Sequence, residues 1–331
     1  MLDFRFGREA LSVAAAAFTL TACGGANTAM SGAAPLGTPL PAAPRGARPL
    51  GWLSSEAKKP REPVIYVADY DGSEVLIYPA HGKSQSPIGM ISSGIDGPYG
   101  LYVDRHRSLY VANRENVTVT VYPAGSASPS VTYSQGLSDP LYPVVDQYGN
   151  LFVSNGDDGS GTVVEYRSGS TTPYQVLQTP GSETDGMDFD RQGNLYVAYR
   201  NYLAYGSYAG SIEEFAPGST HGQVLGIPLN QPQGVVVDRN GNILAVETGY
   251  SDRIDLFPPG EEAPSIEVPM PNGDTPTQLA IRHEENRLFV TGYSGIVYVT
   301  HYPFHAKPYL GAKDYAPGYI QGVALGNGQT F

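Results

Sequence analysis

The sequence has little cysteine, little positive charge and no long apolar run. Cys23 is the only cysteine, so an intrachain disulfide is excluded. The chain has 20 Lys and Arg against 32 Asp and Glu, a net charge of −12, and this acidic balance without basic runs argues against a nucleic-acid partner. The apolar segment from Ala10 to Leu20 is too short to span a bilayer, and no other stretch is long enough. Metalloprotease, nucleophile-elbow, phosphate-loop and dinucleotide-binding signatures are also absent.

What the sequence does contain is a repeated unit of two short apolar runs joined by a turn. The unit occurs at 99–112, 141–154, 185–198 and 233–246, with a degenerate copy at 277–290. Alternating apolar runs around turn residues are typical of two antiparallel strands with a tight loop. The aspartates that open the turns recur at intervals of 42, 44 and 48 residues, at Asp104, Asp146, Asp190 and Asp238. A period of this length, with four strands per unit, predicts an all-β propeller.

The turn residues favour the same hairpins. Asp146, Asp190 and Asp238 are expected to accept hydrogen bonds from backbone amides two residues further on. The glycines that follow, Gly149, Gly193 and Gly241, can take a positive φ without a Cβ clash.

The two ends of the repeat region are complementary. Strands are expected at about 64–68, 74–78 and 87–92, but this first unit lacks the inner strand of the other copies. A matching inner strand occurs at 320–325, near the other end of the sequence. We therefore predict a six-bladed ring over residues 63–331, closed by a C-terminal strand that completes the first blade and removes open sheet edges.

An aromatic residue closes the third strand of each predicted blade. These residues are expected to pack between neighbouring blades; they are Tyr78, Tyr122, Tyr166, Phe215, Phe257 and Tyr302.

The first 62 residues have a different composition. Arg5 and Arg8 precede the short apolar segment, and residues 20–23, Leu-Thr-Ala-Cys, resemble the lipobox of bacterial lipoproteins. The resemblance implies a signal peptide over 1–22, cleavage before Cys23, and diacylglycerol on its sulfur. Residues 23–62 are rich in Ala, Pro and Gly and are expected to form a disordered linker. The protein is then expected outside the cytoplasm, held by lipid on a bacterial outer membrane or cell surface.

The units at 98–113, 185–199 and 232–247 resemble NHL repeats of extracytoplasmic, TolB-like six-bladed propellers. The resemblance covers residues 63–331 and implies the fold, which hosts binding modules, lactonases and lyases alike. The fifth hairpin departs from the pattern, because Arg282 replaces the usual Asp and Glu285 the usual Gly.

Loops at one end of a propeller channel gather polar residues, and such a mouth is the default binding site. The candidates here are Asp69, Asn113, Arg114, Asn155, Asp185, Arg200, Gln233 and Glu247. In the gluconolactonase-like propellers that the chain resembles at the level of the fold, Glu and Asn or Asp hold a divalent cation. The resemblance implies that Asp69, Asn113, Asn155 and Glu247 occupy comparable positions, with oxygen ligands suited to Ca²⁺ or Mg²⁺. No local motif fixes this set of ligands, so the sequence leaves open whether the protein binds a metal.

Four tyrosines occur in a long insertion of the fourth blade, at Tyr199, Tyr202, Tyr205 and Tyr208. They are expected either to stack on a sugar or peptide or to pack on the neighbouring blade.

These observations favour a non-catalytic, lipid-anchored module that binds an envelope protein, a glycan or a small ligand. The alternative is a cation-dependent, lactonase-like or lyase-like enzyme with its site at the channel mouth. A scaffold for an envelope complex is a further possibility. We expect a monomer that contacts the membrane only through its lipid.

Overall fold

The computed structural model describes residues 51–58, 64–80, 86–156, 159, 161–204, 206–249, 251–282, 286–304, 310–314 and 319–326. The chain divides into two units, Met1–Gly46 and Ala47–Phe331, and the described residues all belong to the second. The predicted signal peptide, Cys23 and the linker up to residue 50 lie outside the described residues.

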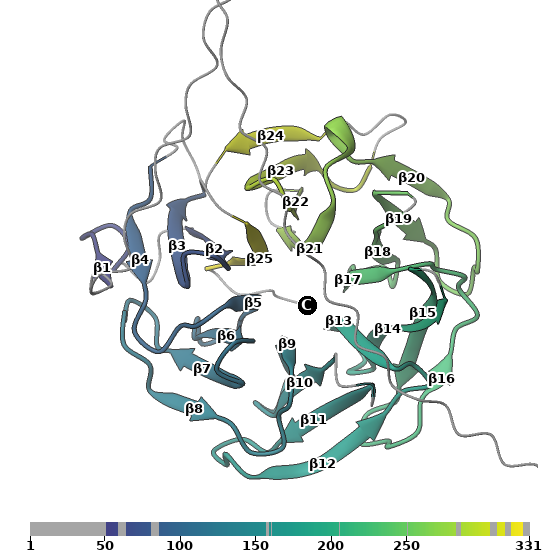
Figure 1. Cartoon of the computed structure of the whole chain (residues 1–331), viewed down its shortest axis with the longest axis horizontal. Coiled ribbons are helices and arrows are strands. Elements are labelled where there is room, and N and C mark those ends of the chain that lie inside the picture. Colours follow the sequence, from purple (N-terminus) through teal and green to yellow (C-terminus); the bar gives the residue numbers. More distant parts are fainter. Residues whose placement is uncertain are drawn as a thin grey trace, which may run out of the picture. The chain divides into compact units, whose positions relative to one another are not determined.

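Six antiparallel sheets surround a central axis, so the predicted six-bladed propeller is confirmed (Figure 1). The inner strand of each blade lies nearest the axis, and the later strands of the blade follow outward. The first blade is composed, from the axis outward, of β25 (Ile320–Leu325), β2 (Val64–Asp69), β3 (Glu74–Pro79), β4 (Gly89–Ile91) and β1 (Trp52–Leu53). Blade 2 contains β5 (Pro98–Val103), β6 (Leu109–Asn113), β7 (Thr118–Tyr122) and β8 (Val131–Tyr133).

The remaining blades repeat this order. Blade 3 contains β9 (Pro140–Val145), β10 (Leu151–Asn155), β11 (Thr162–Tyr166) and β12 (Pro173–Gln178). Blade 4 contains β13 (Glu183–Phe189), β14 (Leu195–Ala204), β15 (Ser207–Phe215) and β16 (Gln223–Val224). Blade 5 contains β17 (Pro232–Val237), β18 (Ile243–Glu247), β19 (Arg253–Phe257) and β20 (Ile266–Pro269). The short 3-10 helix η1 (Pro271–Gly273) precedes blade 6, which contains β21 (Pro276–Arg282), β22 (Arg287–Gly292), β23 (Ile296–His301) and β24 (Gly311–Asp314).

The ring closes as predicted, because β25 pairs with β2 as the inner strand of blade 1. Ile65 lies opposite Leu325, and all six residues of β25 are buried. From the neighbouring β21, Gln278 Oε1 accepts a hydrogen bond of 2.9 Å from Val323 N, while its Nε2 donates to Leu101 O of blade 2 at 2.9 Å. This side chain therefore ties blades 6, 1 and 2 together across the closure.

Blade 1 also has a strand that the sequence did not predict. Trp52 and Leu53 form β1, which pairs with β4 at the outer edge of the sheet. These residues lie within the segment predicted as linker. Trp52 keeps 44% of its surface exposed, whereas Leu53 packs against the buried residues of blades 1 and 2. The strand covers an edge that would otherwise present unpaired backbone groups.

Repeated aspartates hold the turns between the first two strands, as predicted. Asp190 Oδ1 accepts hydrogen bonds from Gln192 N at 2.9 Å and Asn194 N at 2.8 Å, and Gly193 has a φ of 87°. Asn194 Nδ2 donates to the other carboxylate oxygen at 2.8 Å. The same contacts recur at Asp146 and Asp238. Each turn thus satisfies its own backbone, which lets the hairpin form from local sequence.

The predicted packing role of the six third-strand aromatics is confirmed, since all are buried. Tyr122 and Tyr166 also donate hydrogen bonds to backbone carbonyls, Ser93 O and Gln135 O, on the loops that connect each blade to the preceding one. The largest core cluster joins blades 2, 3 and 4.

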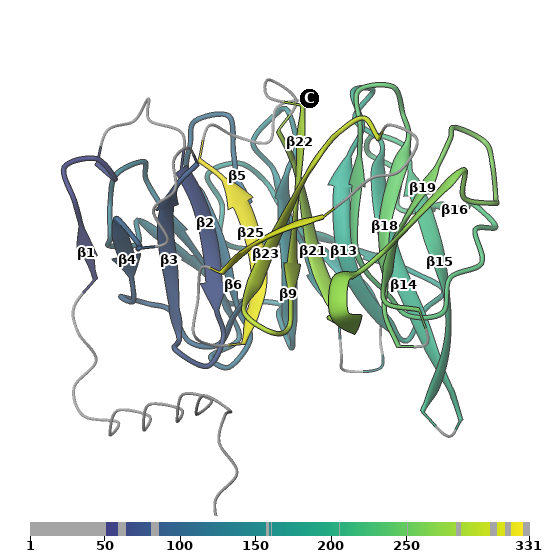
Figure 2. The ribbon, with the colours of Figure 1, turned by 90° about the horizontal axis from the view of Figure 1, so that it is seen from above.

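The two faces of the ring differ. The turn face carries the turns between first and second strands and between third and fourth strands. The mouth face carries the other loops and the β14–β15 hairpin, which extends beyond the neighbouring strands (Figure 2). No helix among the described residues is long and apolar enough to cross a membrane.

Candidate functional site

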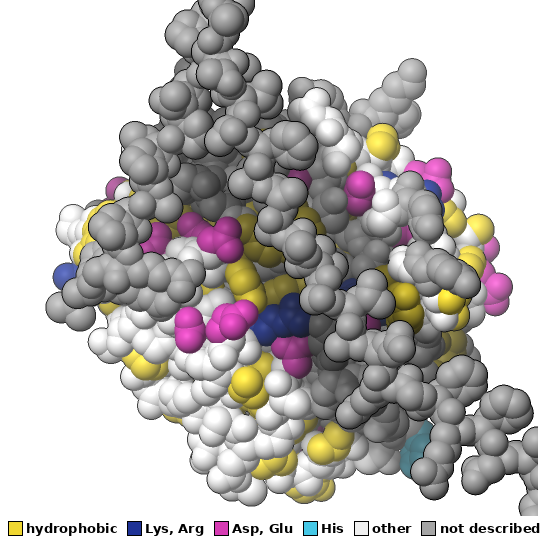
Figure 3. All heavy atoms as spheres, viewed as in Figure 1, with side chains coloured by type: hydrophobic (Ala, Val, Ile, Leu, Met, Phe, Trp, Pro, Cys, Tyr) yellow, Lys and Arg dark blue, Asp and Glu magenta, His cyan; other side chains and the backbone are white. Residues whose placement is uncertain are grey.

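The channel mouth lies where the inner strands begin on the mouth face. We define it by the residues Tyr99, Tyr142, Asp185, Arg200, Gln233, Tyr293, Tyr319 and Gln321. At the centre of the ring, Figure 3 shows Lys or Arg side chains beside Asp or Glu side chains. Three of the predicted site residues lie together here, because Arg200 bonds to Asp185, and Gln233 bonds to Tyr293.

Arg200 is the central cation of the mouth. From β14, its Nη1 donates to Asp185 Oδ2 at 2.6 Å and its Nε to Glu183 Oε2 at 2.5 Å, both on the adjacent β13. The Asp185 side chain is 0% exposed and that of Arg200 is 10% exposed. Burial alone would lower the pKa of Arg200, but Asp185 and Glu183 outweigh it and raise that pKa. The three side chains therefore form a buried, charged cluster held in one sheet.

Arg114 makes a second, more open ion pair at the rim of the mouth. Its Nε donates to Asp139 Oδ1 at 2.8 Å and its Nη2 to Asp139 Oδ2 at 3.0 Å, which is a bidentate contact between blades 2 and 3. The guanidinium lies 5.7 Å from the ring centre of Tyr99. Arg114 was predicted at this site, whereas Asp139 was not.

Tyrosines fill the channel below these charges. Tyr99 and Tyr142 meet edge to face, with ring centres 5.6 Å apart. The Tyr142 hydroxyl donates to Thr277 O of β21 at 3.3 Å, from β9 on the opposite side of the ring (Figure 1). Below Tyr142 lies a cavity of about 10 Å³, which is room for about one water. Side chains therefore close the channel at this level.

A second tyrosine cluster lies on the side of blades 6 and 1. Tyr319 contacts Tyr293 at 4.6 Å and Tyr70 at 5.8 Å between ring centres, and Gln233 Nε2 donates to the Tyr293 hydroxyl at 3.2 Å. Among the described residues, the buried Gln233 Oε1 and Gln321 Oε1 have no hydrogen-bond partner. The mouth therefore offers buried acceptors for the donors of a bound group or of water.

The hydroxyls of Tyr70, Tyr99 and Tyr142 are neutral near physiological pH. Burial is the main cause that raises the pKa of Tyr99 and of Tyr142 well above the ordinary value. Burial, followed by the hydrogen bond to Glu115, raises the pKa of Tyr70 to about 12. These phenols can donate hydrogen bonds and stack, but they cannot act as bases at neutral pH.

The four residues compared with those of a cation site instead accept hydrogen bonds from backbone amides of nearby loops; they are Asp69, Asn113, Asn155 and Glu247. Asn155 Oδ1 accepts hydrogen bonds from Ser138 N at 2.7 Å and Asp139 N at 3.0 Å. Glu247 Oε1 accepts from Asn230 N, and Asn113 Oδ1 from Asp96 N, in the corresponding loops of blades 5 and 2. Asp69 accepts from Gly72 N within its turn.

No group of three or more His, Cys, Asp or Glu side chains in the described part of the chain is placed to hold a metal ion. The arrangement does not fit a shared cation site, because each of the four side chains is committed to the loop of its own blade.

The predicted tyrosine loop is an extended hairpin, because β14 continues to Ala204 and β15 begins at Ser207. Tyr199 is buried, and Tyr205 lies outside the described residues. Tyr202 contacts Tyr208 at 5.4 Å between ring centres, and Arg200 lies 5.4 Å from the ring of Tyr208. At the tip, Tyr202 is 56% exposed and Leu203 is 60% exposed. The hairpin therefore links the buried charges of the mouth to an exposed apolar tip.

Sequence reasoning missed Glu183, Asp139 and Tyr319. Glu183 could have been found from strand register, because it pairs directly with Arg200 between β13 and β14. Asp139 lies on the loop before an inner strand, and its partner belongs to another blade, so no local pattern indicates the contact.

No known protein family and no curated protein matches this sequence. Solved structures do match in fold. A chain of the crystal structure of the nidogen/laminin complex aligns with a TM-score of 0.63 and 15% identity, over 81% of this chain and 100% of that one. Hydrazine synthase of Kuenenia stuttgartiensis aligns with a TM-score of 0.55 and 13% identity, over 75% of each chain. At these identities the likeness shows a six-bladed propeller and no specific family.

Proposed function

We propose that this propeller is a non-catalytic module that binds a partner protein through its mouth face. The observation that carries the proposal is the projecting β14–β15 hairpin, whose tip exposes Tyr202 and Leu203 beside the channel mouth (Figure 2). An exposed Tyr next to an exposed Leu on a rigid scaffold is the kind of feature on which partner proteins concentrate binding energy.

The charges of the mouth support binding rather than catalysis. Glu183 and Asp185 are paired with Arg200, and Asp139 with Arg114. Paired carboxylates and neutral phenols supply a fixed pattern of charge and hydrogen-bond donors, which gives specificity to a protein interface. A general base would need a group whose pKa lies near the working pH and that can reach a substrate.

The fold comparison agrees with a binding role, since one similar propeller was solved in a complex of nidogen with laminin. We also propose that the chain belongs to the NHL-type, TolB-like propellers that its repeats resemble. The fold itself is used for many functions, so the choice rests on the hairpin and the mouth.

We also propose that the protein is tethered outside the cytoplasm by lipid on Cys23. The segment from residue 20 to 23, Leu-Thr-Ala-Cys, is the basis. Cys23→Ser should move the protein from the membrane fraction to the soluble fraction or leave its signal uncleaved. A Ser variant that is processed and membrane-bound like the wild type would contradict the anchor.

Photo-crosslinking tests the binding face. A benzophenone amino acid is placed at Leu203 on the hairpin or at Tyr148 on the turn face, in the full-length protein in its native membrane; both residues are exposed. We expect a discrete crosslinked protein band from position 203 and none from position 148. A band from position 148 alone, or none from either position, would contradict the proposal.

A further inference from the structure

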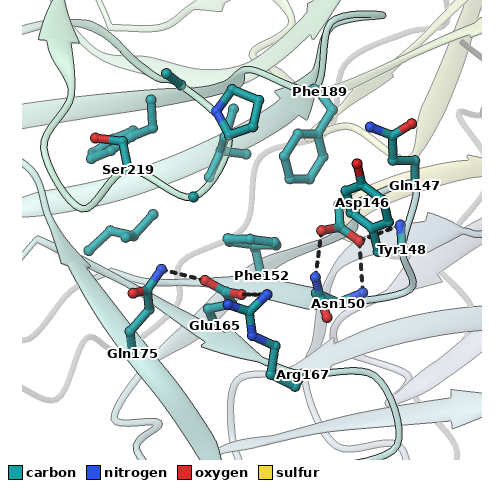
Figure 4. Close-up of a pocket in the computed structure, with 17 residues that line it drawn as sticks. Asp146, Gln147, Tyr148, Asn150, Phe152, Glu165, Arg167, Gln175, Phe189 and Ser219 are labelled. Atoms are coloured by element: carbon teal, nitrogen blue, oxygen red, sulfur yellow. Dashed lines mark hydrogen bonds and ion pairs between the residues drawn. The ribbon is translucent and has the colours of Figure 1, made fainter.

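A cavity of about 270 Å³ lies on the turn face between blades 3 and 4. Figure 4 shows Phe152 of blade 3 and Phe189 of blade 4 in its apolar floor. Further apolar lining residues are Leu177, Leu195 and Phe215. Phe152 and Phe189 meet edge to face, with ring centres 5.3 Å apart. The cavity is therefore large enough for a single ring and has aromatic faces to receive it.

One wall of this cavity is charged, at a position that is aliphatic in three of the other five blades. Glu165 is the residue before the closing aromatic of β11, and the same position is Ile77 in blade 1, Val121 in blade 2 and Leu256 in blade 5. It is the half-buried Glu214 in blade 4 and the exposed His301 in blade 6. Glu165 is only 2% exposed. Glu165 is thus the polar residue that is buried at this position, and a buried carboxylate is costly and typical of functional sites.

The partners of Glu165 compensate only part of the negative charge of its carboxylate. Gln175 Nε2 donates to its Oε2 at 2.6 Å, and Arg167 Nη1 lies 3.2 Å from its Oε1. Burial raises the pKa of Glu165, Gln175 and Arg167 oppose that rise, and Asp146 adds to it. The surroundings thus disfavour the negative charge, so a further cation in the cavity would stabilise it.

The charges that line the cavity favour a cation as well. Asp146 and Glu165 contribute two carboxylates, and Arg167 is the single cation among the described lining residues. The Arg167 guanidinium lies 3.7 Å from the ring centre of Tyr174, which holds it at one side of the opening. The cavity therefore has a net negative charge beside an apolar floor.

We propose that this cavity binds a small organic cation, a primary amine carried on a single aromatic ring. The ring lies on the Phe152 and Phe189 side chains, and the ammonium group contacts Glu165. The site is separate from the mouth face, so it stands whether or not that face binds a protein.

The test uses phenethylamine as the probe, with 2-phenylethanol as its neutral analogue, titrated against the full chain by calorimetry at neutral pH. We expect saturable binding of the amine to the wild type at least about tenfold tighter than the alcohol, a factor that corresponds to about 1.4 kcal/mol. Equal affinities, or no saturable binding of the amine, would overturn the proposal, and this comparison needs no variant.

Two variants test whether the ammonium group of the probe contacts Glu165. Glu165→Gln should remove the preference for the amine over the alcohol. Glu214→Gln is the matched control, because Glu214 precedes the closing aromatic of blade 4 and pairs with Gln223 as Glu165 pairs with Gln175. The control should keep the preference. If Glu214→Gln loses the preference for the amine over the alcohol while Glu165→Gln retains it, the assignment of the site is overturned.

Discussion

The two faces of the propeller are built from different parts of the repeat. On the turn face, Asp146, Asp190 and Asp238 make the same hydrogen bonds in successive blades. On the mouth face, the same repeat position holds Arg114 in blade 2 and Arg200 in blade 4, but their partners differ. Contacts that recur in successive blades thus form the hairpins, whereas contacts that differ between blades are the candidates for binding. On the turn face, Glu165 differs from the equivalent residues by being a fully buried carboxylate.

The largest expected effect comes from breaking the ring that both faces share. Deleting residues 318–331 removes the buried inner strand of blade 1 and exposes the edge of β2. Lost apolar burial at about 25 cal/mol per Å² should cost several kilocalories per mole and lower the cooperativity of unfolding, measured by circular dichroism. Deleting only residues 327–331 keeps β25 and serves as the control. Equal thermal stability of the two truncations would contradict the closure.

A smaller loss of unfolding free energy is expected from breaking either ion pair of the mouth face, and the two losses should differ. Arg200→Ala leaves the fully buried Asp185 without its guanidinium and should cost about 3–5 kcal/mol of unfolding free energy. Arg114 is 30% exposed, so Arg114→Ala should cost about 1 kcal/mol or less. Urea unfolding of both variants measures the difference. Equal losses would show that the Arg200 cluster is not the buried support of the mouth.

Much of this architecture could be predicted from the sequence, because its causes are local. The turn residues around Asp190, the alternation of the strands and the orphan strand at 320–325 each leave a readable pattern. The contacts that charge the mouth are not local: Arg114 and Asp139 come from different blades. Strand β1 arises in a segment rich in Pro and Gly, where pairing with β4 outweighs the local preference. The cavity beside Glu165 depends on how blades 3 and 4 pack, which no repeat encodes.

A pH-dependent effect concerns the turn-face end of the channel. Asp188 accepts hydrogen bonds from Val237 N at 2.8 Å and Phe189 N at 2.9 Å, and burial raises its pKa to about 7 despite these amides. Between about pH 4, where the unfolded chain releases this proton, and about pH 7, the folded chain retains it. Its contribution to stability should therefore be present below that window and be lost as the pH rises through it.

Asp188→Asn should flatten this pH dependence, and urea unfolding across the same window measures the slope. The exposed Asp71→Asn is the control and should keep the slope of the wild type. A slope for Asp188→Asn as steep as that of the wild type would exclude Asp188 as its source.

If the β14–β15 hairpin binds the partner, substitutions at its tip weaken the affinity for that partner. The partner crosslinked at position 203 is purified, and its Kd is measured for the wild type, for Tyr202→Ala with Leu203→Ser, and for Tyr148→Ala with Val176→Ser. All four residues are exposed, and the last two lie on blade 3. We predict that the hairpin variant binds at least about tenfold more weakly with an unchanged Tm, while the blade 3 variant binds like the wild type. An unchanged Kd in the hairpin variant, with or without a lower Tm, would contradict the account.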